Sequence, residues 1–182
     1  MRLFTAFEIS TAANAELRRV QASLRQVLTG GRLTAPENFH VTLHFFGEVT
    51  SEQLGDLDRV LTSALVGEPP FELALDSLGV FPKHGPARVL WAGLAGDVER
   101  LRVLEERMRA ALQPLELLRP DGRYSPHITL ARDPRAHESV RQLAAGYQVR
   151  QVAWRVERLL LFQSVLKPTG ATYQVLNAYS LK

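Results

Sequence analysis

Two short segments of the 182-residue sequence have the residue types and spacing of a catalytic pair: HVTL, which begins at His40, and HITL, which begins at His127. In an extended strand alternate side chains lie on one face, so His40 and Thr42 point one way while the apolar residues point the other. His127 and Thr129 have the same arrangement. Each segment is therefore predicted to be a strand with one apolar face and one polar face.

Two histidines and two threonines that meet at one place suit chemistry at phosphorus. One imidazole can take a proton from an incoming oxygen and the other can protonate a leaving oxygen, because the unperturbed histidine pKa of about 6.5 allows both states near neutral pH. The threonine hydroxyls can donate hydrogen bonds to anionic oxygens. The two segments are nearly symmetric, so the residues alone do not assign the acid and the base.

His44, four residues after His40, raises the alternative of a metal site. On a strand at about 3.4 Å per residue the two imidazoles lie roughly 13 Å apart, too far to share one ion. No cysteine is present, and no glutamate accompanies the histidines in the order of zinc proteases. A single His-x-Thr would be explained as a structural histidine, but two copies favour catalysis without a metal or other cofactor.

The elements that would position these residues alternate along the chain. Hydrophobic periodicity, caps and Gly/Pro boundaries predict strands at Leu3–Ile9, Phe39–Phe46, Phe71–Leu78, Arg88–Leu94, 127–132, Val149–Phe162 and Thr172–Leu181, and helices at Ala12–Leu28, after a Thr50/Gln53 capping box, after an Asp97 cap and at His137–Ala145. Gly30-Gly31 is expected to end the first helix, Asp133-Pro134 to form a turn and RPDGRYSP to form a loop.

The predicted elements recur in the same order, with equivalent starts roughly 84 to 87 residues apart. This indicates an internal duplication with approximate repeats 3–78 and 88–162 and an extra strand at 172–181, all within a single domain of residues 1–182. The expected architecture is two similar lobes that face each other across a cleft, each with a sheet covered on its outer face by helices.

Composition limits the function classes. The net charge of +3 permits an anionic ligand but falls well short of a polybasic nucleic-acid tail. Three of the 22 basic residues are lysines, so the remaining 19 are arginines, which suit bidentate phosphate binding and equally suit a GC-rich genome. Without cysteine there are no disulfides and no thiol nucleophile. The N-terminal segment lacks a signal-like apolar run, and we expect a cytoplasmic protein without membrane association.

Nearly the whole chain resembles the 2H phosphoesterases, and in particular the RNA 2′,3′-cyclic phosphodiesterases that were historically called 2′-5′ RNA ligases. The likeness lies in RLFTAFEI, ENFHVTLHFFGEV, LGVFPKHGPARVLWAGL, YSPHITLAR and LLLFQSVLKPTGATYQVL. The resemblance implies a bilobal α+β fold with mainly antiparallel sheets and an active-site cleft between the lobes. It also implies a substrate of RNA with a 2′,3′-cyclic phosphate end, such as a tRNA-like fragment. We further expect a monomer and a nucleotide ligand in the cleft.

Site residues follow from the resemblance by motif. His127 would be the proton acceptor that activates water, and His40 the proton donor to the departing 3′ oxygen. Thr42 and Thr129 would hold the phosphate. The product would be a 2′-phosphomonoester, and the same histidines could direct a ribose 5′-hydroxyl in place of water, which would give reversible 2′-5′ ligation.

Four further residues are weaker candidates for substrate contact. Arg132 lies five residues after His127, where a regular strand would point it to the opposite face, so it needs a bulge or a strand end to reach phosphate. Phe45 suits the core better than base stacking, although an aromatic ring at the cleft rim would suit a nucleobase. Ser164 and Tyr173 lie where the closing strands of the family pass near the cleft. His44 shares the predicted face of His40 and could line the cleft.

Two alternatives stay open at this point. An RNA-end binding protein could keep the same residues as a binding site without turnover. A cyclic phosphodiesterase acting on a small nucleotide, such as ADP-ribose 1″,2″-cyclic phosphate, would use the same pair of histidines.

Overall fold

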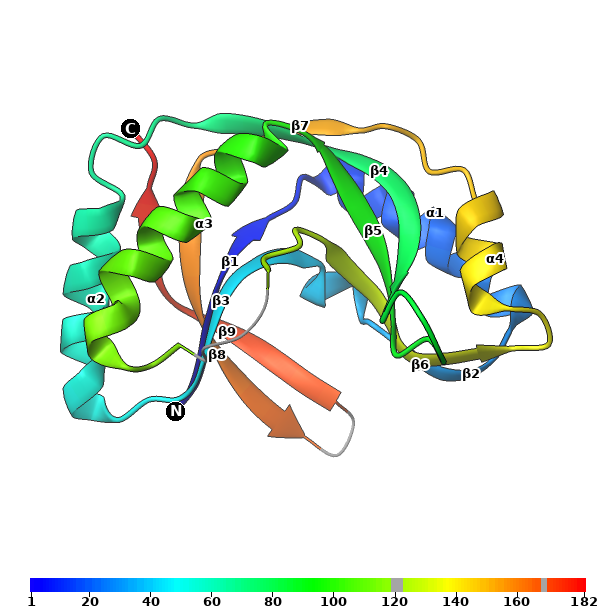
Figure 1. The fold of residues 1–182 in the computed structure, drawn as a ribbon, viewed down its shortest axis with the longest axis horizontal. Coiled ribbons are helices and arrows are strands. Elements are labelled where there is room, and N and C mark those ends of the chain that lie inside the picture. Colours follow the sequence, from blue (N-terminus) through cyan, green and yellow to red (C-terminus); the bar gives the residue numbers. More distant parts are fainter. Residues whose placement is uncertain (119–122, 168–169) are drawn as a thin grey trace.

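Two antiparallel β-sheets form the centre of the fold, and a pair of helices covers each of them (Figure 1). The structure is a computed structural model that describes residues 1–118, 123–167 and 170–182. The first sheet, sheet A, has the strand order β3-β1-β8-β9. Its strands are β1 (Arg2–Glu8), β3 (His40–Glu48), β8 (Arg158–Lys167) and β9 (Gly170–Ser180).

The second sheet, sheet B, has the strand order β2-β6-β5-β4-β7. Its strands are β2 (Leu28–Leu33), β4 (Phe71–Phe81), β5 (Val89–Gly96), β6 (Ile128–Ala136) and β7 (Ala153–Val156). Each sheet takes strands from both halves of the sequence, because β8 joins β1 and β3 while β4 joins β5 and β6. The order β3-β1-β8 thus corresponds to β6-β5-β4. The predicted α+β fold is confirmed, and the duplication remains a proposal that this correspondence favours.

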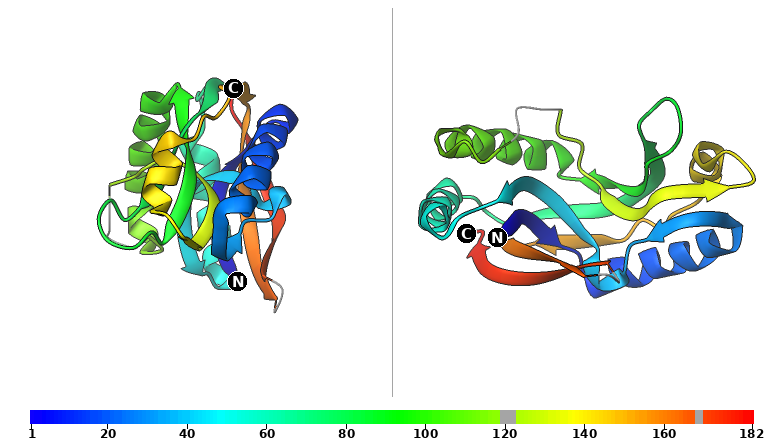
Figure 2. Two further views of the ribbon diagram at one scale, coloured as in Figure 1. Left: turned by 90° about the vertical axis from the view of Figure 1, so that its right-hand side faces the viewer. Right: turned by 90° about the horizontal axis from the view of Figure 1, so that it is seen from below.

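Four α-helices lie on the outer faces of the sheets: α1 (Thr11–Val27), α2 (Ser51–Ala64), α3 (Val98–Leu112) and α4 (Val140–Gly146). Two short 3₁₀ turns, Pro36–Asn38 and Gln113–Leu115, complete the regular structure of the described residues. Helices α2 and α3 pack against each other beside sheet A, whereas α1 and α4 contact sheet B (Figures 1 and 2). None of the helices formed by the described residues is long and apolar enough to cross a membrane.

The helix starts show which caps the sequence predicted correctly. Thr50 and Gln53 form the predicted capping box at α2, with bonds of 3.2 and 3.0 Å. Asp97 occupies the N-cap position of α3, but its side chain makes no cap bond there. Its carboxylate instead accepts a hydrogen bond of 2.9 Å from the Glu72 backbone N–H, because β4 begins beside this helix end. The predicted Asp97 cap bond is therefore wrong.

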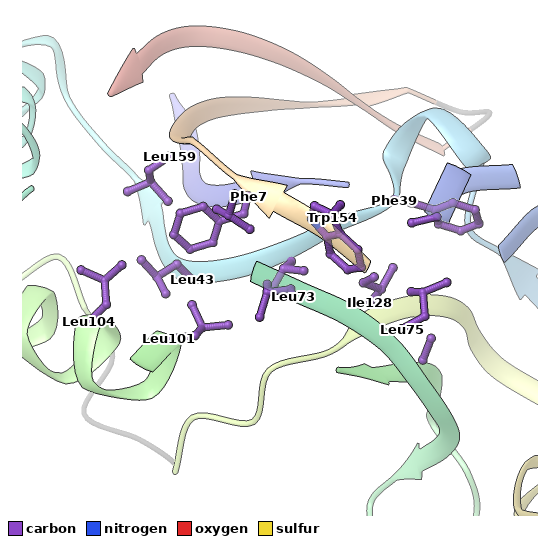
Figure 3. Packing of buried hydrophobic residues seen from close by; sticks show 14 of the residues in the cluster. Phe7, Phe39, Leu43, Leu73, Leu75, Leu101, Leu104, Ile128, Trp154 and Leu159 are labelled. Carbon is purple, nitrogen blue, oxygen red and sulfur yellow. The ribbon is translucent and has the colours of Figure 1, made fainter. Parts of the chain in front are cut away.

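A continuous hydrophobic core lies between the sheets and their helices (Figure 3). Phe7 of β1, Leu73 of β4 and Leu101 of α3 are all fully buried in it. Burying a leucine or phenylalanine side chain completely contributes about 1.5–3 kcal/mol. Ile128 extends the core from the second motif strand. The apolar faces of both motif strands are therefore fixed in one core, which holds the polar faces in a defined place.

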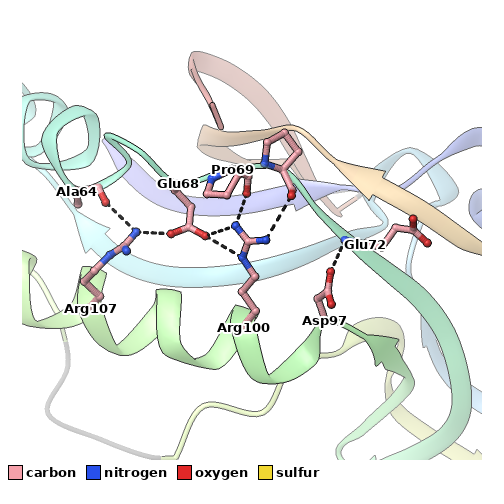
Figure 4. A network of polar contacts seen from close by, with 8 residues as sticks. Ala64, Glu68, Pro69, Glu72, Asp97, Arg100 and Arg107 are labelled. Carbon is pink, nitrogen blue, oxygen red and sulfur yellow. Dashed lines mark hydrogen bonds and ion pairs between the residues drawn. The ribbon is translucent and has the colours of Figure 1, made fainter.

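The segment between α2 and β4 is tied to α3 by a buried carboxylate (Figure 4). Glu68 accepts hydrogen bonds from Arg100 at 2.8 and 3.0 Å and from Arg107 at 2.6 Å. Arg100 also donates to the Pro69 carbonyl at 2.6 Å. Because a buried carboxylate needs charged partners, this network fixes the point where the chain crosses from the helices beside sheet A to sheet B.

Helix α1 ends at Val27, shortly before Gly30-Gly31 as predicted, and the glycine pair itself lies within strand β2. Gly31 has a positive φ of 105°, and a Cβ at this position would meet the backbone oxygen of Asp133 at 2.7 Å. Asp133 also has a positive φ, 47°, and lies inside β6, so the predicted turn at Asp133-Pro134 is wrong. Glycine thus allows β2 to pair closely with a distorted β6.

The predicted long strand 149–162 is also wrong, because the chain leaves one sheet and enters the other within it. β7 pairs with β4 in sheet B, and after Glu157 the chain continues as β8, which pairs with β1 in sheet A. The alternation of apolar and polar residues along 149–162 does not reveal that the chain changes from sheet B to sheet A. Positions 119–122 of the predicted RPDGRYSP loop lie outside the described residues.

Candidate active site

Each motif strand contains a β-bulge directly after its threonine. Along β1, Thr5 pairs with His44 and Ala6 pairs with Thr42, so Leu43 is an extra residue on β3. The bulge puts two consecutive residues, Leu43 and His44, on the buried face. Alternation then resumes, and Phe45 returns to the face of His40 with 59% of its surface exposed.

The second motif strand has the same distortion at the same position. Trp91 pairs with Thr129 and Leu90 pairs with Ala131, so Leu130 is the extra residue on β6. Leu130 and Ala131 are both buried, and Arg132 is exposed on the Thr129 face. This is the bulge that Arg132 needs to lie on the side of His127.

Backbone carbonyls hold both imidazoles in the same tautomer. His40 Nδ1 lies 2.7 Å from the Asn38 carbonyl oxygen, and His127 Nδ1 lies 2.7 Å from the Ser125 carbonyl oxygen. A carbonyl can only accept, so each Nδ1 must carry the proton and donate it. In the neutral imidazole Nε2 is then an unprotonated base, and in the imidazolium Nε2–H is an acid. Both rings therefore offer Nε2 for proton transfer.

Burial and nearby positive charge lower the pKa of both histidines. The pKa of His40 lies at about 4, lowered mainly by burial; the hydrogen bond to Asn38 acts in the opposite direction, and the charges of His127 and Arg132 lower it further. Burial is also the main cause of the lowered pKa of His127, to which the Arg132 charge contributes. The Arg132 guanidinium thus acts on both imidazoles, and an anion bound beside them would raise both pKa values.

Aromatic rings surround His40 on sheet A. The Phe4 ring centroid lies 5.0 Å from that of His40 and 5.6 Å from that of Phe45, and the Phe162 ring stacks on Phe4 at 5.1 Å. Tyr173 lies edge-on to His40 at 5.4 Å. Phe4 and Phe162 were not predicted as site residues. The sequence does not show whether an apolar residue in a strand lines a binding site or lies in the hydrophobic core.

A smaller aromatic group flanks His127 on sheet B. The ring centroids of Phe81 and Trp91 lie 5.1 and 6.3 Å from that of His127. The Trp91 indole lies against Gly79, where any Cβ would collide with it. Gly79 therefore leaves the space that the indole occupies. This role could be recognised only from the strand register, which pairs Gly79 with Trp91.

The structure corrects two expectations about β3. His44 does not line the face of His40: it is buried, with Nε2 3.1 Å from Glu105, which in turn pairs with Arg109 at 2.6 Å. Burial and the Arg109 charge lower the pKa of His44 to about 4. Phe45, expected to suit the core, is instead exposed. The bulge at Leu43 causes both differences.

The remaining candidates are held near the histidines by hydrogen bonds and strand pairing. Tyr124 Oη donates a 2.9 Å hydrogen bond to the Thr42 carbonyl, which ties the segment before His127 to β3. Asn38 Nδ2 donates to the Ala171 carbonyl of β9 at 3.0 Å. Ser164 pairs with Tyr173 between β8 and β9. The β8–β9 hairpin is thus anchored beside His40.

No group of three or more His, Asp or Glu side chains within the described parts of the chain is placed to hold a metal ion. His84 and His137 are exposed. The expectations of no metal and no cofactor stay predictions.

Paired His-x-Thr strands on two helix-backed sheets define a 2H phosphoesterase. The sequence model described as LigT like Phosphoesterase matches residues 7–91 and 94–173, so the chain belongs to this family and is an enzyme of the phosphoesterase class.

Named relatives and a solved structure agree with this assignment. The RNA 2′,3′-cyclic phosphodiesterase of Methanothermobacter thermautotrophicus is 30% identical over 100% of this chain and 99% of its own length. The protein of that name from Thermus thermophilus is 34% identical over 100% of this chain and 91% of its own length. The crystal structure of TT0787, also from Thermus thermophilus, has a TM-score of 0.80 and 32% identity, and the match covers 100% of this chain and 98% of that chain.

Proposed function

We propose that this protein hydrolyses the 2′,3′-cyclic phosphate at the end of RNA to a 2′-phosphomonoester, with His127 as general base and His40 as general acid. The observation that carries the proposal is the shared tautomer, since the Asn38 and Ser125 carbonyls leave Nε2 of each histidine available. Relatives named RNA 2′,3′-cyclic phosphodiesterase support the substrate.

The proposed reaction is an in-line displacement at phosphorus. A water oxygen forms a new bond to phosphorus while Nε2 of His127 takes one of its protons, and the bond to the 3′ oxygen breaks as Nε2 of His40 donates a proton to that oxygen. Each positioned proton transfer contributes on the order of 10² to 10⁴ in rate. The phosphate stays on the 2′ oxygen.

The lowered pKa values set the starting protonation states. A neutral His127 is ready to act as base in the absence of substrate. His40 needs a proton, which the bound phosphate anion favours because it offsets the positive charges that lower the pKa of His40. No metal or other cofactor takes part in this scheme.

The remaining contacts bind the substrate. Thr42 and Thr129 donate to the nonbridging phosphate oxygens, and Arg132 supplies the opposite charge. Phe45 and Tyr173 present aromatic surface to the terminal nucleoside, and Ser164 lies beside Tyr173.

The same two histidines would also run 2′-5′ ligation. If a ribose 5′-hydroxyl takes the place of water, His127 removes its proton and the product is a 2′-5′ phosphodiester. We propose this as a reversible second activity. We also propose a cytoplasmic monomer, a proposal that rests on the sequence alone.

One experiment separates this function from its alternatives. The protein is incubated with a dinucleotide that ends in a 2′,3′-cyclic phosphate and, in parallel, with ADP-ribose 1″,2″-cyclic phosphate. We expect turnover of the dinucleotide at the higher kcat/KM. Binding that leaves the ring closed would indicate an RNA-end binding protein, and faster opening of the ADP-ribose compound would indicate a small-nucleotide enzyme.

A further inference from the structure

Two arginines lie directly opposite each other at the edge of sheet B. Arg32 of β2 pairs with Arg132 of β6, and the next pair along is Leu33 with Ala131. Ala131 is fully buried and Leu33 packs against the core, so the arginines lie on the other face, which is the face of Thr129. Opposite residues in an antiparallel pair share a face, with Cα atoms about 4.5 to 5.5 Å apart. The guanidinium of Arg32 therefore lies on the same face as that of Arg132, with its Nη2 4.0 Å from Asp133 Oδ2 of β6.

This pairing has an excess of positive charge. Like charges directly opposite in a sheet are destabilising. The carboxylate in contact is Asp133, whose Oδ1 lies 2.9 Å from Arg88 and whose Oδ2 lies 4.0 Å from Arg32. One carboxylate thus accompanies three guanidiniums, and among the described residues no acidic side chain forms an ion pair with Arg132. Arg32 keeps 80% of its side chain exposed.

Sheet B therefore carries a row of positive charge that begins beside the phosphate-binding threonine and ends at an open edge. β2 is an edge strand, about 4.8 Å from its neighbour β6. Successive phosphates on one strand of a DNA duplex are spaced by about 3.4 Å along the helix axis, a step of the same order. Guanidinium groups in such a row suit phosphodiesters, because they are permanently charged and bind phosphate oxygens in bidentate fashion.

We propose that Arg32 binds the internucleotide phosphodiester next to the terminal cyclic phosphate, so that the enzyme prefers RNA ends to cyclic mononucleotides. The proposal rests on the proposed function of the same site and adds to it a residue, Arg32, that recognises the chain beyond the terminal nucleotide. Asp133 holds Arg88 closely at 2.9 Å but lies 4.0 Å from Arg32, so the exposed Arg32 guanidinium can turn to a ligand.

The test compares kcat/KM on three substrates: a 2′,3′-cyclic mononucleotide, a short oligonucleotide with a cyclic phosphate end, and the same oligonucleotide with a neutral methylphosphonate in place of its last internucleotide phosphodiester. The measured quantity is the ratio of the oligonucleotide value to the mononucleotide value. In Arg32→Gln we expect this ratio to fall about tenfold, as loss of one charged phosphate contact should produce. With the methylphosphonate oligonucleotide, the wild type should show the same roughly tenfold lower ratio of oligonucleotide to mononucleotide kcat/KM.

Two further results make the test selective. The neutral linkage and Arg32→Gln together should lower the ratio no further than either change alone, and the salt dependence for the oligonucleotide should weaken by about 0.7 in its log–log slope. Arg18→Gln, on the exposed face of α1, is the matched control and should keep the wild-type ratio.

An unchanged ratio in Arg32→Gln, or an equal loss on the neutral-linkage substrate, would overturn the proposal. Failure of the proposed function would look different, because the wild type would then open none of the three substrates. In that case, binding of the charged and neutral oligonucleotides, measured by fluorescence anisotropy, would still decide whether Arg32 contacts the phosphodiester.

Discussion

Phe45 and Arg132 occupy equivalent positions, each five residues after a histidine of the pair and each returned to the histidine face by a β-bulge. One sheet therefore presents an exposed ring at this point and the other presents a positive charge. The different residues at these two equivalent positions make the site asymmetric, although the motifs and their bulges are nearly identical. This asymmetry gives the substrate a direction: the base is expected on the side of sheet A, beside Phe45, and the charged phosphate contact on the side of sheet B, at Arg132.

The ring of Phe45 should contribute to binding and little to folding. With 59% of Phe45 exposed and 6% of Phe46 exposed, the neighbouring residues are a matched pair. Phe45→Ala should raise KM for a cyclic-phosphate substrate by about tenfold, since stacking on a base contributes about 1–3 kcal/mol, with little change in Tm. Phe46→Ala should instead lower the free energy of unfolding by about 3–5 kcal/mol. Equal changes of KM and of unfolding free energy in the two variants, measured by steady-state kinetics and urea unfolding, would contradict a binding role for Phe45.

The pH profile should reveal how the bound anion changes His40. The acid must be protonated, so activity falls as the pH rises through its pKa, and this pKa is about 4 in the empty site. A bound phosphate anion raises it. The falling limb should therefore lie at higher pH in kcat, which reports the bound state, than in kcat/KM, which reports the unbound enzyme.

Arg132→Gln supplies the control for that profile. Removing the guanidinium charge should raise the pKa of His40 and of His127, because Arg132 lowers both. In this variant both limbs of kcat/KM should move to higher pH. A kcat/KM profile of Arg132→Gln with limbs at the wild-type pH would contradict this electrostatic effect of Arg132. A falling limb at the same pH in kcat and kcat/KM of the wild type would contradict the effect of the bound anion.

Gly79 should be required for the position of Trp91. A methyl group at Gly79 would collide with the indole, so Gly79→Ala should cost about 1–3 kcal/mol of unfolding free energy and also lower kcat, since Trp91 flanks His127. Gly55→Ala is the control: it lies in α2 with open space around it and should stabilise the protein by about 0.5–1 kcal/mol. A stable, fully active Gly79→Ala enzyme would refute this role.

Chelation should leave the reaction unaffected. The scheme uses two imidazoles and no metal, so prolonged treatment with EDTA, followed by its removal, should give unchanged kcat with a cyclic-phosphate substrate. Activity that disappears and returns with added zinc or manganese would favour a metal-dependent mechanism. Magnesium alone serves as a control for effects of the cation on the RNA.

The polar face of each motif strand could be predicted from the sequence because strand alternation is local. His40 and Thr42 lie on the same face of their strand because alternate side chains of a β-strand share a face. The same holds for His127 and Thr129. The capping box at Thr50 is equally local. In each case a few neighbouring residues determine the outcome, so a short pattern is enough.

Features that depend on a partner strand could not be predicted. Nothing in the residue letters marks Leu43 and Leu130 as bulged, since the extra residue is defined by the pairing with β1 and β5. The exposure of Phe45 follows from the bulge. The change of sheet at Glu157 likewise depends on partner strands, because β7 pairs with β4 before it and β8 pairs with β1 after it.

Paired-histidine opening of a cyclic phosphate can be checked from the product that a single defined substrate gives. An oligonucleotide with a 2′,3′-cyclic phosphate end is incubated with the wild type, His40→Ala and His127→Ala, each first shown to unfold cooperatively near the wild-type Tm. The account predicts a 2′-phosphomonoester from the wild type and a loss in kcat on the order of 10² to 10⁴ in each variant. A 3′-phosphomonoester, or near wild-type turnover by either variant, would contradict it.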